Sequence, residues 1–174
     1  IRLVVLILGF YTGMRRREII ASCVGDVTRI GTQEFLVRAN AERQLKSSSA
    51  TRRLAIELQI PPHHLDEINS LVEYRMYKGA SEREYLFNLD SEKGIYINEK
   101  SVFEHVQWLL QFITGDSKTR FHHLRHSCGT WALWRWSSLH LITTDEWHSV
   151  LPTHDHSVLV REYKGLFGSY NSNY

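Results

Sequence analysis

Three consecutive arginines, Arg15, Arg16 and Arg17, follow a Thr-Gly-Met segment at 12–14 and directly precede Glu18. The sequence pattern places them at the start of a short helix. An arginine presents a planar fork of donors that can bind two phosphate oxygens at once, and a helix N-terminus adds backbone donors. The segment therefore predicts an anion-binding site. The alternative is a solvent-exposed basic turn in which Glu18 pairs with an arginine along the helix.

A second chemical cluster is the segment Phe-His-His-Leu-Arg-His-Ser at 121–127. On a helix, His122, Arg125 and His126 lie three or four residues apart and share one face. An arginine neutralises non-bridging phosphate oxygens while a histidine exchanges a proton near neutral pH, so this face suits phosphoryl chemistry. His122 and His126 also have the spacing of two zinc ligands, but the glutamate of an HExxH motif and a third ligand are not evident, and no metal site is predicted. A histidine pair at the edge of the core is the other alternative.

A third candidate is Lys46, in the polar segment 45–53. The segment is expected to form the tip of a hairpin that continues into a basic strand. A lysine at this position could reach a phosphate or a leaving oxygen, whereas exposed lysines in turns usually have no such role.

Composition limits which class of protein can carry these clusters. The chain has 174 residues, of which 43% are hydrophobic and 11% aromatic, so it can bury a core and is not a disordered linker. Its formal charge of +2 does not identify a nucleic-acid binder, and any contact with a polyanion must come from local clusters. Cys23 and Cys128 lack CxxC or zinc-finger spacing and are predicted to be free thiols in a reducing compartment.

The N-terminal apolar run at 3–10 is too short to span a membrane and lacks the features of a signal peptide, so a soluble, cytoplasmic protein without a membrane partner is expected. Because the chain begins at Ile1 inside a predicted buried helix, we also expect it to be a fragment of a longer protein.

The elements that must position these clusters follow from hydrophobic periodicity. Helices are predicted at 1–9, 15–22, around 65–72, at 98–114 and from 121 to about 134, with one more at 156–166. Strands are predicted at 27–30, 34–39 and 52–58, and a short one at 85–87. The fold class is therefore α+β, mostly helical, with a small antiparallel three-stranded sheet in the N-terminal third of a single domain, 1–174. The apolar face of the helix at 98–114 is expected to comprise Val102, Val106, Leu109, Leu110 and Ile113.

Taken together and in this order, the clusters resemble the catalytic domain of the tyrosine recombinases, the phage integrase family that cuts and rejoins DNA. The family box TG-x-R-x-x-E-L is similar to the segment 12–19, with Ile19 in place of leucine. In the family, a lysine on a hairpin precedes Ser/Thr-x-Arg, and an apolar residue followed by proline closes the strand. Lys46 matches the lysine, 51–53 match Ser/Thr-x-Arg, and 60–61 match the closing pair. Residues 85–87 resemble the family's short strand, and 122–127 match the H-x-L-R-H-[ST] box at every position. The resemblance spans most of the chain.

The last box of the family is L-G-H, followed nine positions later by the nucleophilic tyrosine. His154 and Tyr163 have this spacing, although Pro152 and Thr153 replace Leu-Gly and no Thr-Thr precedes the tyrosine. By resemblance, Tyr163 would attack the phosphorus to form a 3′-phosphotyrosyl link and His154 would add a hydrogen bond. Alternatively, an insertion after the Trp-rich stretch 131–136 would place the true histidine and tyrosine beyond residue 174.

The resemblance also implies roles for the other residues. Arg15 and Arg125 would clamp the non-bridging oxygens, and His122 would accept or orient the phenolic proton. Lys46 would protonate the departing 5′ oxygen, while Glu18 would orient an arginine or the histidine. Because the covalent link conserves the energy of the phosphodiester bond, no cofactor is expected.

The implied partner is double-stranded DNA, with self-association into a tetramer on paired sites. In the family, an N-terminal domain completes the clamp around DNA; we expect this chain to be a fragment without that domain and therefore to bind weakly. An alternative is a catalytically inactive DNA-binding module on the same scaffold, and another is a helical domain whose basic residues are simply solvated. The basic residues expected to meet phosphates are Arg15, Arg16, Arg17, Lys46, Arg52, Arg53, Lys118, Arg120 and Arg125.

Overall fold

The computed structural model describes residues 1–44, 51–88 and 99–141, with side chains as far as Trp134. Three predicted site residues, Lys46, His154 and Tyr163, lie outside the described residues, as does the helix predicted at 156–166. The described elements are α1 (Arg2–Thr12), α2 (Arg16–Ile20), a short 3₁₀ helix η1 (Val24–Asp26), β1 (Val27–Thr28), β2 (Glu34–Val37), β3 (Arg52–Leu54), α3 (Ile56–Gln59), α4 (Pro62–Tyr77), α5 (Glu99–Thr114) and α6 (Phe121–Leu141). The predicted class, mostly helical with a small antiparallel three-stranded sheet, is confirmed.

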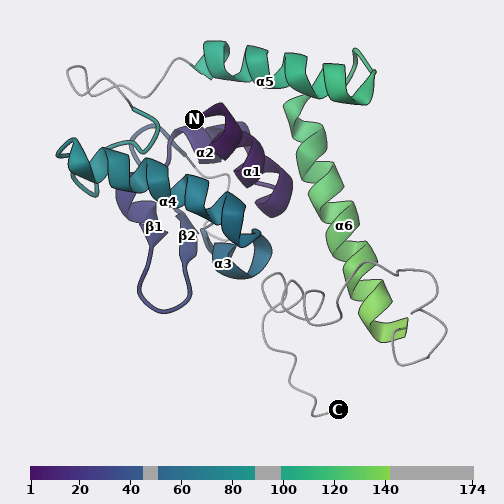
Figure 1. Cartoon of the computed structure of the whole chain (residues 1–174), viewed down its shortest axis with the longest axis horizontal. Helices are drawn as coiled ribbons and strands as arrows, with labels where there is room; N and C mark the ends of the chain where they lie inside the picture. The colour runs from purple at the N-terminus through teal and green to yellow at the C-terminus, as the bar shows by residue number, and fades with distance from the viewer. Residues whose placement is uncertain (45–50, 89–98, 142–174) are drawn as a thin grey trace.

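Helix α1 forms the centre of the domain, with α4, α5 and α6 packed around it (Figure 1). Most of its apolar side chains are fully buried, which explains the nearly continuous hydrophobic run of its sequence. The helix ends at Gly13, whose φ of 61° lies in the left-handed region that favours glycine at a helix C-terminus. Gly13 thereby redirects the chain into α2, which carries Glu18.

Helix α6 crosses α1 so closely that one position on α1 has no room for a side chain. A Cβ at Gly9 would lie 2.5 Å from Cζ of Phe121, a buried ring that also packs edge-on against Phe103. We expect Gly9→Ala to lower the free energy of unfolding by about 2 kcal/mol, because the ring and helix α6 must shift. Thermal or urea unfolding measures this effect.

Gly129, within α6, provides the matched control for this substitution. A Cβ there meets no atom within 4 Å, and the position is helical. Gly129→Ala should therefore raise stability by about 0.5–1 kcal/mol through helix propensity. Equal effects of the two substitutions would contradict the close α1–α6 contact.

The sheet has the order β1-β2-β3, with antiparallel pairing throughout. Its third strand is shorter than predicted. The expectation of a strand over 52–58 is wrong beyond Leu54, because the chain turns at Ala55 and forms α3. This turn of helix buries Ile56 and Gln59 before Pro61. The predicted strand at 85–87 is reduced to a single antiparallel bridge between Cys23 and Tyr85.

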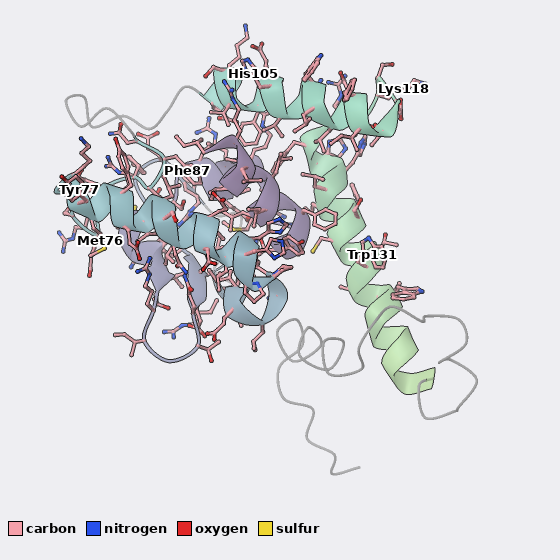
Figure 2. All side chains as sticks on the ribbon, viewed as in Figure 1. Met76, Tyr77, Phe87, His105, Lys118 and Trp131 are labelled. Carbon is pink, nitrogen blue, oxygen red and sulfur yellow. The ribbon has the colours of Figure 1, made fainter. Side chains whose placement is uncertain are left out.

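Helix α4 bears out the predicted helical periodicity in full, and α5 bears it out at three of its five predicted positions. On α4, the predicted apolar positions 65, 68, 71 and 72 are all buried. On α5, Val102, Val106 and Leu110 are buried together with Phe103, but Leu109 is only half-buried and Ile113 is 69% exposed. The prediction for Ile113 is wrong because the last turn of α5 leads into the exposed turn before α6, where residues 112–118 are all exposed. Figure 2 shows Lys118 in that turn, on the opposite side of the molecule from the end of α4, which carries Met76 and Tyr77.

Among the described residues, none of the helices combines the length and the apolar character that crossing a bilayer requires.

Candidate active site

The carboxylate of Glu18 binds two arginines from different parts of the chain. Arg15, directly before α2, donates from its backbone N to Oε2 at 2.8 Å and from Nη1 to Oε1 at 2.9 Å. Arg52, on β3, donates from Nη2 to Oε2 at 2.8 Å and from Nη1 to Oε1 at 3.2 Å. Glu18 therefore ties α2 to the sheet while its side chain is only 4% exposed.

These bonds keep Glu18 ionised despite its burial. Desolvation alone would raise the pKa of the carboxyl group, but the hydrogen bonds from Arg52 and from the backbone of Arg15, with the charge of Arg52, lower the pKa to about 2. At neutral pH the group is a fixed anion that orients two guanidinium groups. The sequence-based expectation that Glu18 orients an arginine agrees with this geometry.

A third arginine reaches the same place from α6, 110 positions after Arg15. Arg125 donates from Nη1 to the carbonyl oxygen of Gly13 at 2.6 Å, two residues before Arg15. A Cβ at Gly13 would lie 3.6 Å from Cγ of Arg125 and 3.3 Å from Sγ of Cys128, so the arginine packs directly on this turn. The side chain of Arg125 therefore packs on Gly13, the glycine with left-handed backbone geometry at the end of α1, and donates to its carbonyl oxygen.

Electrostatics also link Arg125 to the pair held by Glu18. Desolvation lowers the pKa of the Arg125 guanidinium, and the positive charge of Arg15 lowers it further. The charge of the Glu18 carboxylate raises this pKa and so opposes both effects, while Arg52 lowers it by a smaller amount. Two guanidinium groups therefore bind the Glu18 carboxylate, and a third, Arg125, lies near enough to interact electrostatically with Arg15 and Glu18, so positive charge is in excess. We call Arg15, Arg52, Arg125 and Glu18 the arginine cluster.

The arginine cluster is open to solvent on the side of its cations. The side chain of Arg15 is 50% exposed and that of Arg52 is 28% exposed, and Arg125 is exposed as well. An anion can approach all three, whereas the carboxylate beneath them is buried. Convergent guanidinium groups with unbalanced charge are an arrangement that binds phosphate and stabilises charge developing on its oxygens.

The first two turns of α6 carry three histidines, of which His122 and His126 are exposed and His123 is half-buried. The ring of His122 lies with its centroid 4.2 Å from that of His123 and 5.7 Å from that of His126. Desolvation lowers the pKa of His122, and the charges of His123, His126 and Arg120 lower it further. A neutral imidazole can accept a proton, and His122 stands one helical turn before Arg125.

Five of the other predicted DNA contacts lie away from the arginine cluster or have acidic partners. Arg16 and Arg17 pair with Glu99 at the start of α5, at 3.3 and 3.8 Å, and Arg16 lies 4.3 Å from the centroid of the Phe103 ring. Arg53 pairs with Glu34 across β2 and β3 at 3.2 Å. Lys118 and Arg120 are exposed in the turn before α6.

Lys46 lies outside the described residues, and its role stays a prediction. Strands β2 and β3 pair with Val37 opposite Arg52, so the connection that includes Lys46 begins and ends beside the arginine cluster. His154 and Tyr163 lie outside the described residues, and their roles stay predictions. Within the described ranges, no three His, Cys, Asp or Glu side chains are grouped so that they could hold a metal ion.

Sequence reasoning missed Asp26 and Arg43, which form an ion pair close to Glu18 of the arginine cluster. It assigned Arg52 only to DNA binding, although this arginine also pairs with Glu18. One feature of the sequence indicated that Arg52 has a partner within the protein. In an alternating strand, Arg52 lies on the same side as Leu54, which packs against the core. Arg43 gave no signal at all, since a single arginine in a polar connection is ordinarily exposed.

Comparison with known proteins found no matching protein-family model, no matching curated protein and no matching solved structure.

Proposed function

We propose that this chain is a DNA strand transferase of the tyrosine recombinase type, which cleaves and rejoins duplex DNA through a 3′-phosphotyrosyl intermediate. The observation that carries the proposal is the convergence of Arg15 and Arg125, two arginines distant in sequence, around Gly13 and Glu18. The resemblance of the sequence boxes to that family, noted above, supports the same assignment.

The arginine cluster would act on the scissile phosphate. A DNA phosphodiester carries negative charge that repels a nucleophile, and two exposed guanidinium groups can neutralise its non-bridging oxygens. They also stabilise the additional charge of the pentacoordinate transition state. Glu18 holds Arg15 and Arg52 in place before the substrate arrives, so less reorganisation is needed during the reaction.

The remaining steps require a nucleophile, a base and an acid. In the proposed reaction, the phenolic oxygen of Tyr163 attacks the phosphorus in line and the P–O5′ bond breaks. His122 takes the phenolic proton and Lys46 protonates the departing 5′ oxygen. The rejoining step reverses these transfers, so neither a nucleotide cofactor nor a redox reagent is consumed.

A covalent-trapping experiment tests the proposal. The chain is incubated with a pool of duplexes of random sequence, each with a nick that lets the short 5′-hydroxyl product diffuse away after cleavage. We expect a protein–DNA adduct that survives denaturing electrophoresis, and sequencing of the trapped DNA reports the preferred site. Tyr163→Phe should abolish the adduct because the attacking oxygen is gone.

Tyr77→Phe is the matched control, because Tyr77 is 86% exposed at the end of α4. This variant should form the adduct as the wild type does. An adduct that persists in Tyr163→Phe would exclude Tyr163 as the nucleophile. Binding of the duplexes without any adduct by the wild-type chain would favour a DNA-binding module without chemistry.

A further inference from the structure

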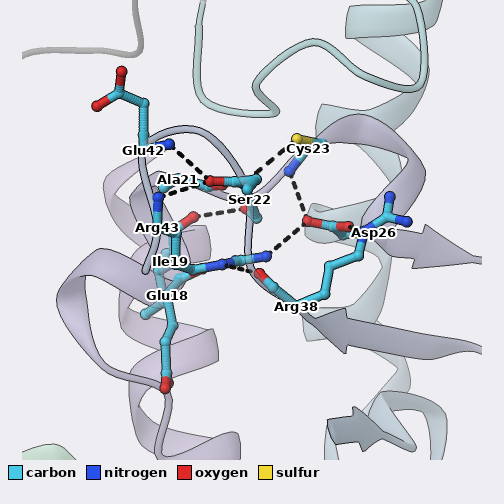
Figure 3. A network of polar contacts seen from close by, with 10 residues as sticks. Glu18, Ile19, Ala21, Ser22, Cys23, Asp26, Arg38, Glu42 and Arg43 are labelled. Atoms are coloured by element: carbon cyan, nitrogen blue, oxygen red, sulfur yellow. Dashed lines mark hydrogen bonds and ion pairs between the residues drawn. The ribbon is translucent and has the colours of Figure 1, made fainter. Parts of the chain in front are cut away.

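Figure 3 shows a buried ion pair between Arg43 and Asp26, which lies close to Glu18 of the arginine cluster. The side chain of Arg43 is 1% exposed and that of Asp26 is 0% exposed, with Nη2 of the arginine 3.3 Å from Oδ2 of the aspartate. Arg43 also donates from Nη1 to the carbonyl oxygen of Glu18 at 2.7 Å and from Nε to the carbonyl oxygen of Arg38 at 2.5 Å. Its guanidinium group therefore joins three segments of the chain.

Asp26 and Asn40 hold this arginine in place. The carboxylate of Asp26 also accepts from the backbone N of Cys23 at 2.9 Å and from Nε of Arg38 at 2.8 Å. Asn40 accepts from the backbone N of Arg43 at 2.8 Å, and its amide donates to the carbonyl oxygen of Ala21. Residues 38–43, which follow β2, are thus fixed against residues 18–26.

This network and the arginine cluster share one residue, Glu18. Glu18 accepts from Arg43 through its backbone carbonyl, and through its carboxylate it binds Arg15 and Arg52. Arg52 stands on β3, opposite Val37 at the end of β2. Arg43 therefore makes a second connection from Glu18, in α2, to the chain that follows β2, in addition to the ion pair between Glu18 and Arg52 on β3.

A buried ion pair is an inefficient means of gaining stability, because desolvation offsets much of the attraction. Its directional hydrogen bonds instead fix the relative position of the groups that it joins. We propose that Arg43 is a positioning residue that, held by Asp26, sets the spacing between Arg15 and Arg52 so that both meet phosphates of bound DNA. This inference rests on the proposed function, and Arg43 itself is too deeply buried to touch DNA.

The salt dependence of DNA affinity tests this role, because the slope of log affinity against log salt counts phosphate contacts. Arg43→Lys keeps the buried charge but replaces a forked donor with a point donor. We expect its affinity for duplex DNA to fall about tenfold and its salt slope to fall by about one. A purely structural role would reduce the fraction of active protein and leave the slope unchanged.

Arg38→Lys is the matched control, because Arg38 bonds to the same aspartate while its side chain is 48% exposed. It conserves charge and should keep the wild-type slope. The double variant Arg43→Lys with Arg52→Ala should have the slope of Arg52→Ala alone, since the contact that Arg43 positions is already lost.

A wild-type slope in folded Arg43→Lys would overturn the inference. If circular dichroism shows that Arg43→Lys is unfolded, Asn40→Ala replaces it, because it removes the hydrogen bonds of Asn40 to Arg43 and Ala21 without leaving a buried charge unpaired. A reduced salt slope in Asn40→Ala supports the inference, and a wild-type slope overturns it. The proposed function fails separately, if Arg15→Ala and Arg52→Ala both keep the wild-type slope.

Discussion

Replacing Arg125 with alanine should slow formation of the phosphotyrosyl adduct by about 10²–10³-fold, the effect of removing one donor to a developing oxyanion. The guanidinium group of Arg125 donates to the carbonyl oxygen of Gly13 and the residue is exposed, so its loss would remove one of the cations around the phosphate in the proposed site. Equilibrium affinity for duplex DNA should fall less, by about tenfold, because an interaction that strengthens in the transition state affects the rate most. Single-turnover kinetics on the trapped substrate and fluorescence anisotropy measure the two effects.

Arg29→Ala is the control for charge alone. Arg29 has a side chain that is 40% exposed and pairs with Glu73 at 3.0 Å, and it belongs to the turn after β1 rather than to the arginine cluster. Its removal subtracts the same charge from the surface, so the adduct rate should change by no more than about twofold. Equal effects of the two substitutions would show that only net charge matters.

Glu18→Gln should lower the free energy of unfolding at pH 7 by about 3 kcal/mol. The pKa of Glu18 is lowered to about 2, and a carboxyl group whose folded pKa lies below its unfolded value of about 4.3 stabilises the protein above that value. The glutamine also leaves Arg15 and Arg52 without the anion that orients them. Chemical denaturation at several pH values measures this loss.

The pH dependence separates this electrostatic contribution from packing. As the pH falls from about 5 through 2, Glu18 becomes protonated in the wild type and the difference in stability from Glu18→Gln should shrink toward zero. Glu34→Gln is the control, because Glu34 pairs with Arg53, whose side chain is 73% exposed, and an exposed pair contributes about 0–1 kcal/mol. A difference for Glu18→Gln that is independent of pH would contradict the stabilisation of its ionised form.

Periodicity predicted the helices well because burial on one face is a local property of the sequence. The four apolar positions of α4 are an example. The pattern failed where neighbouring elements decide the outcome. Leu54, Ile56 and Leu58 alternate as in a strand, but the turn at Ala55 converts the second half of the pattern into α3. Ile113 fits the apolar face of α5, yet it lies beyond the part of the helix that the core covers.

The arginine cluster was predictable in part. The boxes at 12–19 and 122–127 indicated Arg15 and Arg125, and the alternative pairing of Glu18 with an arginine along the helix is also present. The sequence pattern could not indicate that Arg52 is the second arginine, after Arg15, that binds the Glu18 carboxylate. That contact depends on the register of β2 and β3, which sets which side chains reach α2. The buried pair of Asp26 and Arg43 depends on the same packing.

A double-mutant cycle on DNA affinity with Arg15→Ala and Arg125→Ala, at fixed salt and with equal folded fractions, tests most directly whether these arginines act on one phosphate. If they do, the loss in the double variant should be smaller than the sum of the single losses by about 1 kcal/mol or more, roughly a fivefold difference in affinity. Losses that add within about 0.5 kcal/mol would show that the two residues bind DNA independently and would contradict the shared phosphate site.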